Sequence, residues 1–122
     1  MRHSYTERIG PYVTDALREA SNARSRGQPE TEFRYLERAH VLGQSSTYWH
    51  TRVHWAMGRW AFRNRAPGEF FGQLLRIAGA ATKTPFGLVP EGNTGGSNVS
   101  PFRRMPIAAD LRHIIETARS AD

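Results

Sequence analysis

Four residues that can bind a transition metal lie in two short, regularly spaced pairs. Glu37 and His40 are three residues apart, and His50 and His54 are four residues apart. Both spacings place two side chains on one face of an α-helix. Two such pairs on neighbouring helices would converge on one point, as the ligands of metal sites in helical bundles do. Imidazole and carboxylate ligands together suit Zn, Ni, Fe or Mn.

The chain between the two pairs is short, so their helices should be antiparallel neighbours. Reflecting one helix onto the other about the turn between them predicts that His40 lies level with His50. At about 1.5 Å per residue, Glu37 then lies level with His54, one turn further along. We expect His40, His50 and His54 to bind the metal, with Glu37 as the fourth ligand. Glu69 is a further candidate ligand, or else an acceptor that orients one imidazole.

Known metal motifs fit these residues only in part. A Glu-x-x-His helix is half of the di-iron carboxylate pattern, which needs a second such motif and additional glutamates. The His-Glu-x-x-His motif of the zinc proteases is absent, because the residue directly after His50 is a threonine. The four side chains could also satisfy one another in the core, with Arg38 or Arg76 neutralising Glu37, and bind nothing. Whether the protein is an enzyme is open, since an open coordination position and a pocket cannot be read from the sequence.

Helical periodicity predicts the elements that would carry these residues. Apolar residues recur at helical spacing, and glycine or proline interrupts the chain between the periodic segments. We expect a single all-α domain, residues 1–122, of four to five helices. These helices are predicted at about 5–25, 29–42, 46–63, 67–82 and 108–119. Their short connections predict two antiparallel hairpins, packed as a bundle or in a tetratricopeptide-like manner.

Residues 84–106, called the wrap below, are rich in glycine and proline and do not have the pattern of a helix or a long strand. A solvated linker has no need of apolar residues, yet this segment contains Phe86, Leu88, Val89, Val99, Phe102 and Met105. We therefore expect an ordered wrap that packs these side chains on the helices and covers one side of the histidine site. Its Gly92–Gly96 run could hold an anion with backbone N–H groups. A tight turn that needs positive φ is the preferred interpretation of these glycines.

Charge and composition argue against several functional classes. The net charge is +6, but 16 of the 17 basic residues are arginines scattered along the chain, so we do not expect nucleic-acid binding. The absence of cysteine excludes disulfides and thiolate zinc sites. The sequence shows neither a membrane-spanning segment nor a signal peptide, so we expect a cytoplasmic protein. Trp55 points away from the face of His54 and would suit an interface, which leaves a homo-oligomer open.

Four short runs are specific when taken together: Glu37-Arg38-Ala39-His40 with Gly43-Gln44, His50-x-x-x-His54, Glu69-x-x-Gly72-Gln73, and Gly92-Asn93-Thr94-Gly95-Gly96 through Ser100-Pro101-Phe102. With these runs the chain resembles a bacterial family catalogued as a domain of unknown function. Near the C-terminus that family is richer in proline than Met105-Pro106-Ile107-Ala108. The resemblance implies no activity, cofactor or partner. It does imply that the histidines and the wrap form one unit.

The sequence thus predicts a small helical protein that binds a divalent transition metal through a His/Glu cluster. Whether the metal would be structural, sensed, carried or catalytic is left open. The alternative is a tetratricopeptide-like module that binds another protein and whose histidines belong to a purely structural polar core.

Overall fold

The computed structural model describes residues 3–88, 90–97, 99–100 and 102–120. The described residues form α-helices and one short 3-10 helix, with no strand among them, which confirms the predicted all-α fold. The elements are α1 (Tyr5–Ser25), α2 (Pro29–Gly43), α3 (Thr47–Arg63), α4 (Pro67–Lys83), η1 (Thr84–Phe86) and α5 (Ala109–Ser120). None of these helices combines the length and the apolar character that crossing a bilayer requires.

Local sequence signals set where the helices begin and end. Pro29 and Pro67 each occupy the first turn of a helix, where a missing N–H costs nothing. Ser46 caps α3, because its hydroxyl accepts a hydrogen bond from the N–H of Trp49. Gly27 ends the first hairpin helix with a positive φ of 68°. These signals place the helices close to their expected bounds.

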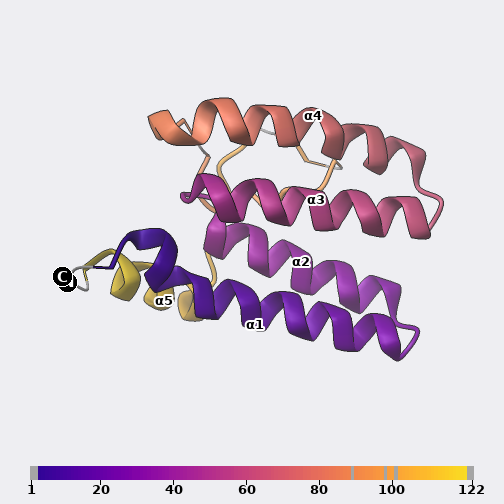
Figure 1. Cartoon of the computed structure of the whole chain (residues 1–122), viewed down its shortest axis with the longest axis horizontal. Helices are drawn as coiled ribbons and strands as arrows, with labels where there is room; N and C mark the ends of the chain where they lie inside the picture. The colour runs from indigo at the N-terminus through magenta and orange to yellow at the C-terminus, as the bar shows by residue number, and fades with distance from the viewer. Residues whose placement is uncertain (1–2, 89, 98, 101, 121–122) are drawn as a thin grey trace.

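The four long helices lie side by side in chain order, and each runs antiparallel to the one before it (Figure 1). This arrangement confirms the expected antiparallel hairpins. The shorter α5 packs against α1 and α2. The apolar core lies between α1, α2, α3 and α5, and its largest side chains include Ile9, Val13, Leu42, Val53 and Met57.

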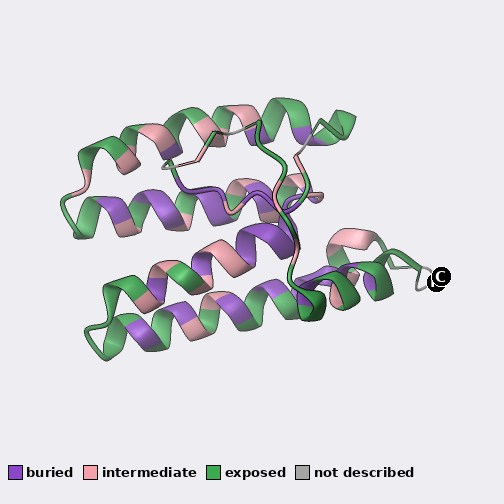
Figure 2. Cartoon of the chain, turned by 180° about the vertical axis from the view of Figure 1, so that it is seen from behind, coloured by how far each residue is buried: buried purple, intermediate pink, exposed green. Residues whose placement is uncertain are grey.

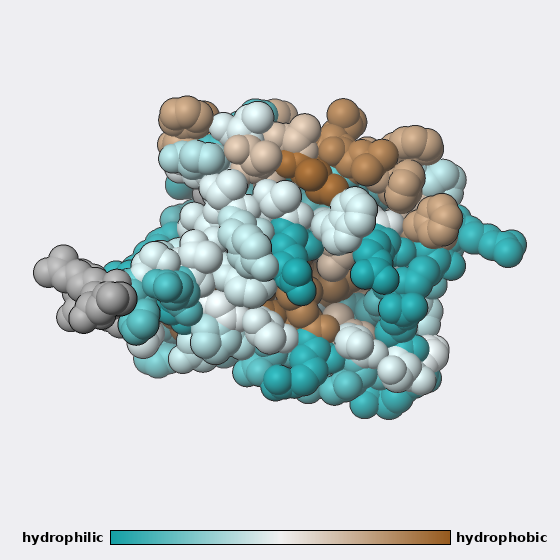
Figure 3. Space-filling model, in the orientation of Figure 1, coloured by the Kyte–Doolittle hydropathy of each residue, from teal (hydrophilic) through white to brown (hydrophobic). Residues whose placement is uncertain are grey.

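Helix α4 stands apart from this core. It packs on α3 and continues into η1, and its only buried residues are Gln73 and Ala80. Figure 3 shows apolar side chains gathered along the upper edge of the molecule, over α4. Phe71, Leu74 and Leu75 are among the exposed ones. Helix α4 therefore leaves much of its apolar surface uncovered.

The wrap crosses the face of α3 and α4 before the chain reaches α5 (Figure 2). It contacts the helices through its glycine and asparagine run, of which Gly92, Asn93, Gly95 and Gly96 are buried. The Asn93 side chain donates hydrogen bonds, both 2.8 Å long, to the carbonyls of Ser100 and Arg103. These bonds join the first part of the wrap to its later part. The wrap is thus ordered mainly by polar contacts.

The expected packing of the large apolar side chains of the wrap is wrong for three of them. Phe86, Leu88 and Phe102 are exposed, with 78%, 65% and 72% of their surface accessible. The wrap instead approaches α2 through its glycine run, where a Cβ on Gly95 would lie 2.5 Å from Cδ2 of His40, and these larger side chains lie outside that close approach. Val99 and Met105 are half-buried, and Val89 lies outside the described residues.

Candidate metal centre

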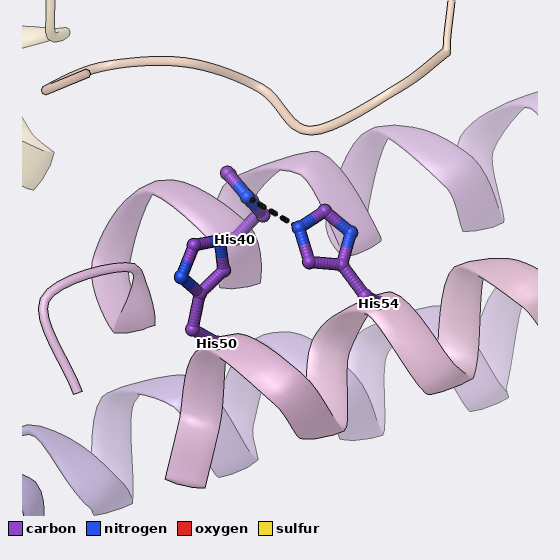
Figure 4. A group of neighbouring side chains, drawn as sticks. All are labelled: His40, His50 and His54. Carbon is purple, nitrogen blue, oxygen red and sulfur yellow. Dashed lines mark hydrogen bonds between the residues drawn. The ribbon is translucent and has the colours of Figure 1, made fainter. Parts of the chain in front are cut away.

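Three buried histidines meet between α2, α3 and the wrap (Figure 4). His40 comes from α2, and His50 and His54 come from adjacent turns of α3. Their ring centroids are 4.7–4.9 Å apart. One ring nitrogen from each residue lies within 4.8 Å of the other two, close enough to hold one metal ion.

His40 lies beside His50, as the reflection predicts, and it also lies beside His54. His40 contacts both histidines of α3, and its Nε2 lies 3.2 Å from Nε2 of His54. The reflection treats the helices as parallel lines and ignores the length of the imidazole side chains, so it pairs His40 with His50 alone. The observed arrangement brings three imidazoles to one point, and not to two separate levels.

Two of the histidines have their tautomer fixed by their neighbours. The backbone carbonyl of Asn93 lies 2.6 Å from Nδ1 of His40, and a carbonyl can only accept, so this Nδ1 carries a proton. Nδ1 of His54 lies 2.5 Å from Oε1 of Gln73. The Gln73 amide is itself oriented, because its Nε2 donates to the Gly95 carbonyl at 2.9 Å. His54 therefore also carries its proton on Nδ1.

With Nδ1 protonated, Nε2 of a neutral imidazole carries a lone pair and can only accept. The 3.2 Å contact between the Nε2 atoms of His40 and His54 then joins two acceptors. Two lone pairs at this distance repel each other unless a proton or a cation lies between them. A tetrahedral ion with bonds of about 2.1 Å separates its ligands by about 3.4 Å, close to the observed distance.

His50 completes the arrangement. Its Nδ1 lies 2.7 Å from the hydroxyl oxygen of Thr84, which can accept a hydrogen bond from Nδ1–H. All three Nδ1 atoms thus have a protein partner, which is the usual way in which a metal-binding histidine is oriented. The three Nε2 atoms are left for a common ligand.

Burial keeps the imidazoles neutral. Loss of solvent, followed by the charges of its two neighbours, lowers the pKa of His40 well below its ordinary value. Loss of solvent is also the main reason why the pKa of His50 falls to about 3 and that of His54 to about 4. Near neutral pH the histidines are therefore in the form that binds metal, and no proton is readily available to bridge the facing Nε2 atoms.

The two glutamates lie outside the group of histidines. Glu37 is half-buried beside Thr94 of the wrap, and burial raises the pKa of its carboxyl more than the Thr94 hydroxyl lowers it. A spacing of three residues turns Glu37 about 60° around α2 from His40, enough to aim it at the wrap. Glu69 accepts a hydrogen bond from the N–H of Ser97 at 2.6 Å and so fastens the wrap to α4.

The arginines considered as partners of Glu37 have other roles. Arg38 pairs with Asp110 of α5 at 2.8 Å. Arg76 donates to the wrap carbonyls of Gly95 and Val99, at 3.2 Å and 2.6 Å. The sequence also allowed an inert core in which Arg38 or Arg76 neutralises Glu37. Neither arginine has this role, because both are paired with other groups.

Sequence reasoning missed the residues that orient the histidines, namely Gln73, Thr84 and Asn93. It also missed a steric role for Gly95. This residue has a φ of +86°, and a Cβ built on it would lie 2.5 Å from Cδ2 and 2.9 Å from Nε2 of His40. Only glycine allows the wrap to approach the imidazole so closely. Two of the short runs that carry the family resemblance contain Gln73 and Gly95, and they were the only indication in the sequence that these residues matter.

The glycine run of the wrap is a tight turn. Gly92 and Gly95 both have positive φ. The N–H of Gly95 donates to the side chain of Asn93 at 2.9 Å, and the N–H of Asn93 donates to the Pro90 carbonyl at 3.2 Å. These groups are engaged inside the turn, as the preferred interpretation of the sequence requires.

A pocket of about 600 Å³ opens beside the histidines, between α4 and the wrap. All three histidines line it, as do Gln44 and the buried Asn93. The buried nitrogens are therefore accessible from a space of the size that small-molecule sites usually have.

Comparison with known proteins places the chain in a family. No curated protein and no solved structure matches it. A family model described as a protein of unknown function, DUF3703, matches residues 7–115. This span includes the three histidines, Gln73 and the whole wrap. The chain therefore belongs to the DUF3703 family of proteins of unknown function.

Proposed function

We propose that this protein binds a divalent transition metal through the Nε2 atoms of His40, His50 and His54. The observation that carries the proposal is the donor set. The Nδ1–H groups of His40 and His54 donate hydrogen bonds to neighbouring acceptors. Two buried Nε2 lone pairs therefore face each other at 3.2 Å. A bound cation removes their repulsion and uses the lone pairs as ligands.

The ligand set favours some metals over others. Three neutral imidazoles without thiolate or carboxylate suit Zn or Ni better than Mn or Fe, which prefer oxygen ligands. A zinc ion with three histidines keeps a fourth position for water or another ligand. The neighbouring pocket gives that position access to small molecules.

A purely structural polar core is a weaker explanation of the same residues. In such a core the polar groups pair donor with acceptor, whereas His40 and His54 present acceptor to acceptor. The alternative function, a tetratricopeptide-like module that binds a protein, is favoured by one separate observation. The apolar surface of α4, including Phe71 and Leu75, is exposed, and large exposed apolar patches often mark interaction sites.

Metal analysis of protein purified without a histidine tag tests the proposal. Wild-type protein incubated with Zn and desalted should retain about one ion per chain. A His50→Ala, His54→Ala double variant should retain none, with its helical circular dichroism preserved. His113→Ala, which removes an exposed histidine of α5, is the matched control and should bind like the wild type. Equal metal content in wild type and double variant would refute the proposal.

A further inference from the structure

The pocket beside the histidines has one wall formed by a single stripe of α4. Gly68, Gly72, Arg76, Gly79 and Lys83 follow one another at helical spacing and all line it. A Cβ built on Gly68 or Gly79 would meet nothing within 4 Å. Gly68 and Gly79 thus leave open space in the pocket, whereas a Cβ on Gly72 would lie 2.7 Å from Cβ of Ser97, where the wrap meets α4.

The charged groups of the pocket are of one sign. Arg76 and Lys83 line it, and no aspartate or glutamate is among its described lining residues. Within the described chain, no carboxylate oxygen lies within 4.0 Å of either cation. The Lys83 ammonium instead lies 4.7 Å from the centre of the Phe102 ring. With a divalent ion on the histidines, the pocket would attract an anion strongly.

The outer part of the pocket is apolar. Leu75, Leu88 and Phe102 line it and are largely exposed. Exposed apolar side chains around a concave site are typical of ligand pockets, where an apolar body covers them. A ligand that fits both features is therefore anionic at one end and apolar along the rest of its length.

A buried acceptor indicates where the polar end of such a ligand would lie. Gln44, which lines the pocket, is 97% buried, and its Oε1 has no hydrogen-bond partner among the described residues. Its amide is oriented, because Nε2 donates to the Pro90 carbonyl at 2.7 Å. Gln44 caps the C-terminus of α2 with helical backbone angles and follows His40 by four residues, so the two side chains lie on the same side of the helix. A buried acceptor left without a donor is costly, which favours a donor bound beside the histidines.

We propose that this pocket binds a small carboxylate with an apolar body, in an inference that rests on the proposed metal site. One carboxylate oxygen would take the fourth position on the metal, and a water between the other carboxylate oxygen and Gln44 would donate to Oε1 of Gln44. Lys83 and Arg76 supply the positive field around the carboxylate. The apolar body lies along Leu75, Leu88 and Phe102.

The test uses cobalt as a spectroscopic probe and octanoate as the ligand. Protein is first loaded with Co²⁺ and the bound metal is measured. Octanoate is then titrated while the visible absorption of the cobalt, which depends on coordination geometry, and the heat of binding are followed. Octanoate should change the spectrum saturably. Acetate, which lacks the apolar body, and octanol, which lacks the charge, should each bind at least about tenfold more weakly.

Variants separate the pocket from the metal. Gly79→Leu fills the open space and should weaken octanoate binding at least about tenfold with unchanged cobalt content. Ala78→Leu adds the same side chain at the neighbouring exposed position, which does not line the pocket, and should have no effect. Lys83→Met should weaken octanoate binding and leave that of octanol unchanged. Gly68→Leu repeats the filling experiment at a second open position in case Gly79→Leu disturbs the helix.

The two proposals fail in distinguishable ways. Absence of cobalt from the wild-type protein overturns the metal site itself. Normal cobalt content with a spectrum that octanoate leaves unchanged overturns the carboxylate pocket alone. Octanoate binding that survives both Gly79→Leu and Gly68→Leu overturns it as well, since the ligand would then lie elsewhere.

Discussion

Replacing Gly95 by alanine should damage the metal site through a contact that the histidines themselves do not reveal. The new Cβ would lie 2.5 Å from Cδ2 of His40, whereas ordinary contacts begin at 3.4 Å. Either the imidazole or the wrap must therefore move by roughly 1 Å, while a metal–ligand bond tolerates about 0.2 Å. We expect Gly95→Ala to lower the affinity for Zn by about 10–100-fold, the range seen when the groups supporting a ligand are disturbed.

The backbone effect of the substitution can be subtracted with a matched variant. Gly95 and Gly27 both have positive φ, +86° and +68°, but a Cβ on Gly27 would meet nothing within 4 Å. Alanine at either position costs about 1–3 kcal/mol of backbone strain. Overpacking against His40 adds about 1–3 kcal/mol at Gly95 alone. Urea denaturation of the two metal-free variants measures this difference in the free energy of unfolding.

A competition titration with a chromophoric chelator measures Zn affinity for the same variants. Gly27→Ala should bind Zn like the wild type, because Gly27 ends α1 and makes no contact with the site. The reasoning is refuted if Gly95→Ala retains wild-type affinity. It is equally refuted if Gly27→Ala loses as much affinity as Gly95→Ala, since backbone strain would then explain the whole effect.

Four further outcomes follow from the structure. Gln73→Leu leaves the Nδ1–H of His54 without an acceptor and should lower Zn affinity about 10–100-fold, whereas Gln73→Glu keeps an acceptor and should lose less; the same chelator competition compares them. In metal-free protein, His54 takes up a proton near pH 6.5 in the unfolded chain but only near pH 4 in the folded protein. The free energy of unfolding is therefore greatest above pH 6.5 and falls on acidification. From His54 alone the loss between pH 7 and pH 5 should be about 2 kcal/mol, and equal urea midpoints at the two pH values would contradict it. Arg63→Met breaks the 2.7 Å ion pair with buried Glu32 and should destabilise the protein by about 2–3 kcal/mol, a loss that urea denaturation would detect and that Glu32→Gln in the same chain should partly restore. Removal of metal by a chelator should preserve the helical circular dichroism and lower the melting temperature by a few degrees, because the apolar core of the described residues is formed without the histidines. A random-coil spectrum would show that the metal is needed for folding.

The helices could be read from the sequence because their signals are local. Proline in a first turn, a serine cap and the helical spacing of apolar residues act within a few positions of each other, so α2, α3 and α4 lie close to where they were expected. The clustering of His40, His50 and His54 follows from the same periodicity, once the two helices are paired.

The rest of the site depends on the path of a segment without periodicity. Which acceptors reach the Nδ1 atoms is determined by where the wrap docks, and no spacing in the sequence predicts that Asn93 lies beside His40. Glu37 shares a helix with His40, but a difference of about 60° around that helix is enough to aim it elsewhere. The apolar character of Phe86 and Phe102 predicted burial, but composition alone cannot show that both side chains remain exposed.

The carbonyl of Asn93 and the imidazole of His40 are 53 residues apart in the chain. The short α2–α3 connection is enough to bring the three imidazoles together, whereas the Asn93 carbonyl reaches them only when a much longer loop closes. Until it does, His40 is free to carry its proton on either nitrogen, and one of those forms offers no lone pair to the centre. Closing that long loop therefore selects the tautomer, and an ion that binds the selected tautomer in turn opposes reopening of the loop. Metal binding and the contact between Asn93 and His40 would thus stabilise each other across a long loop.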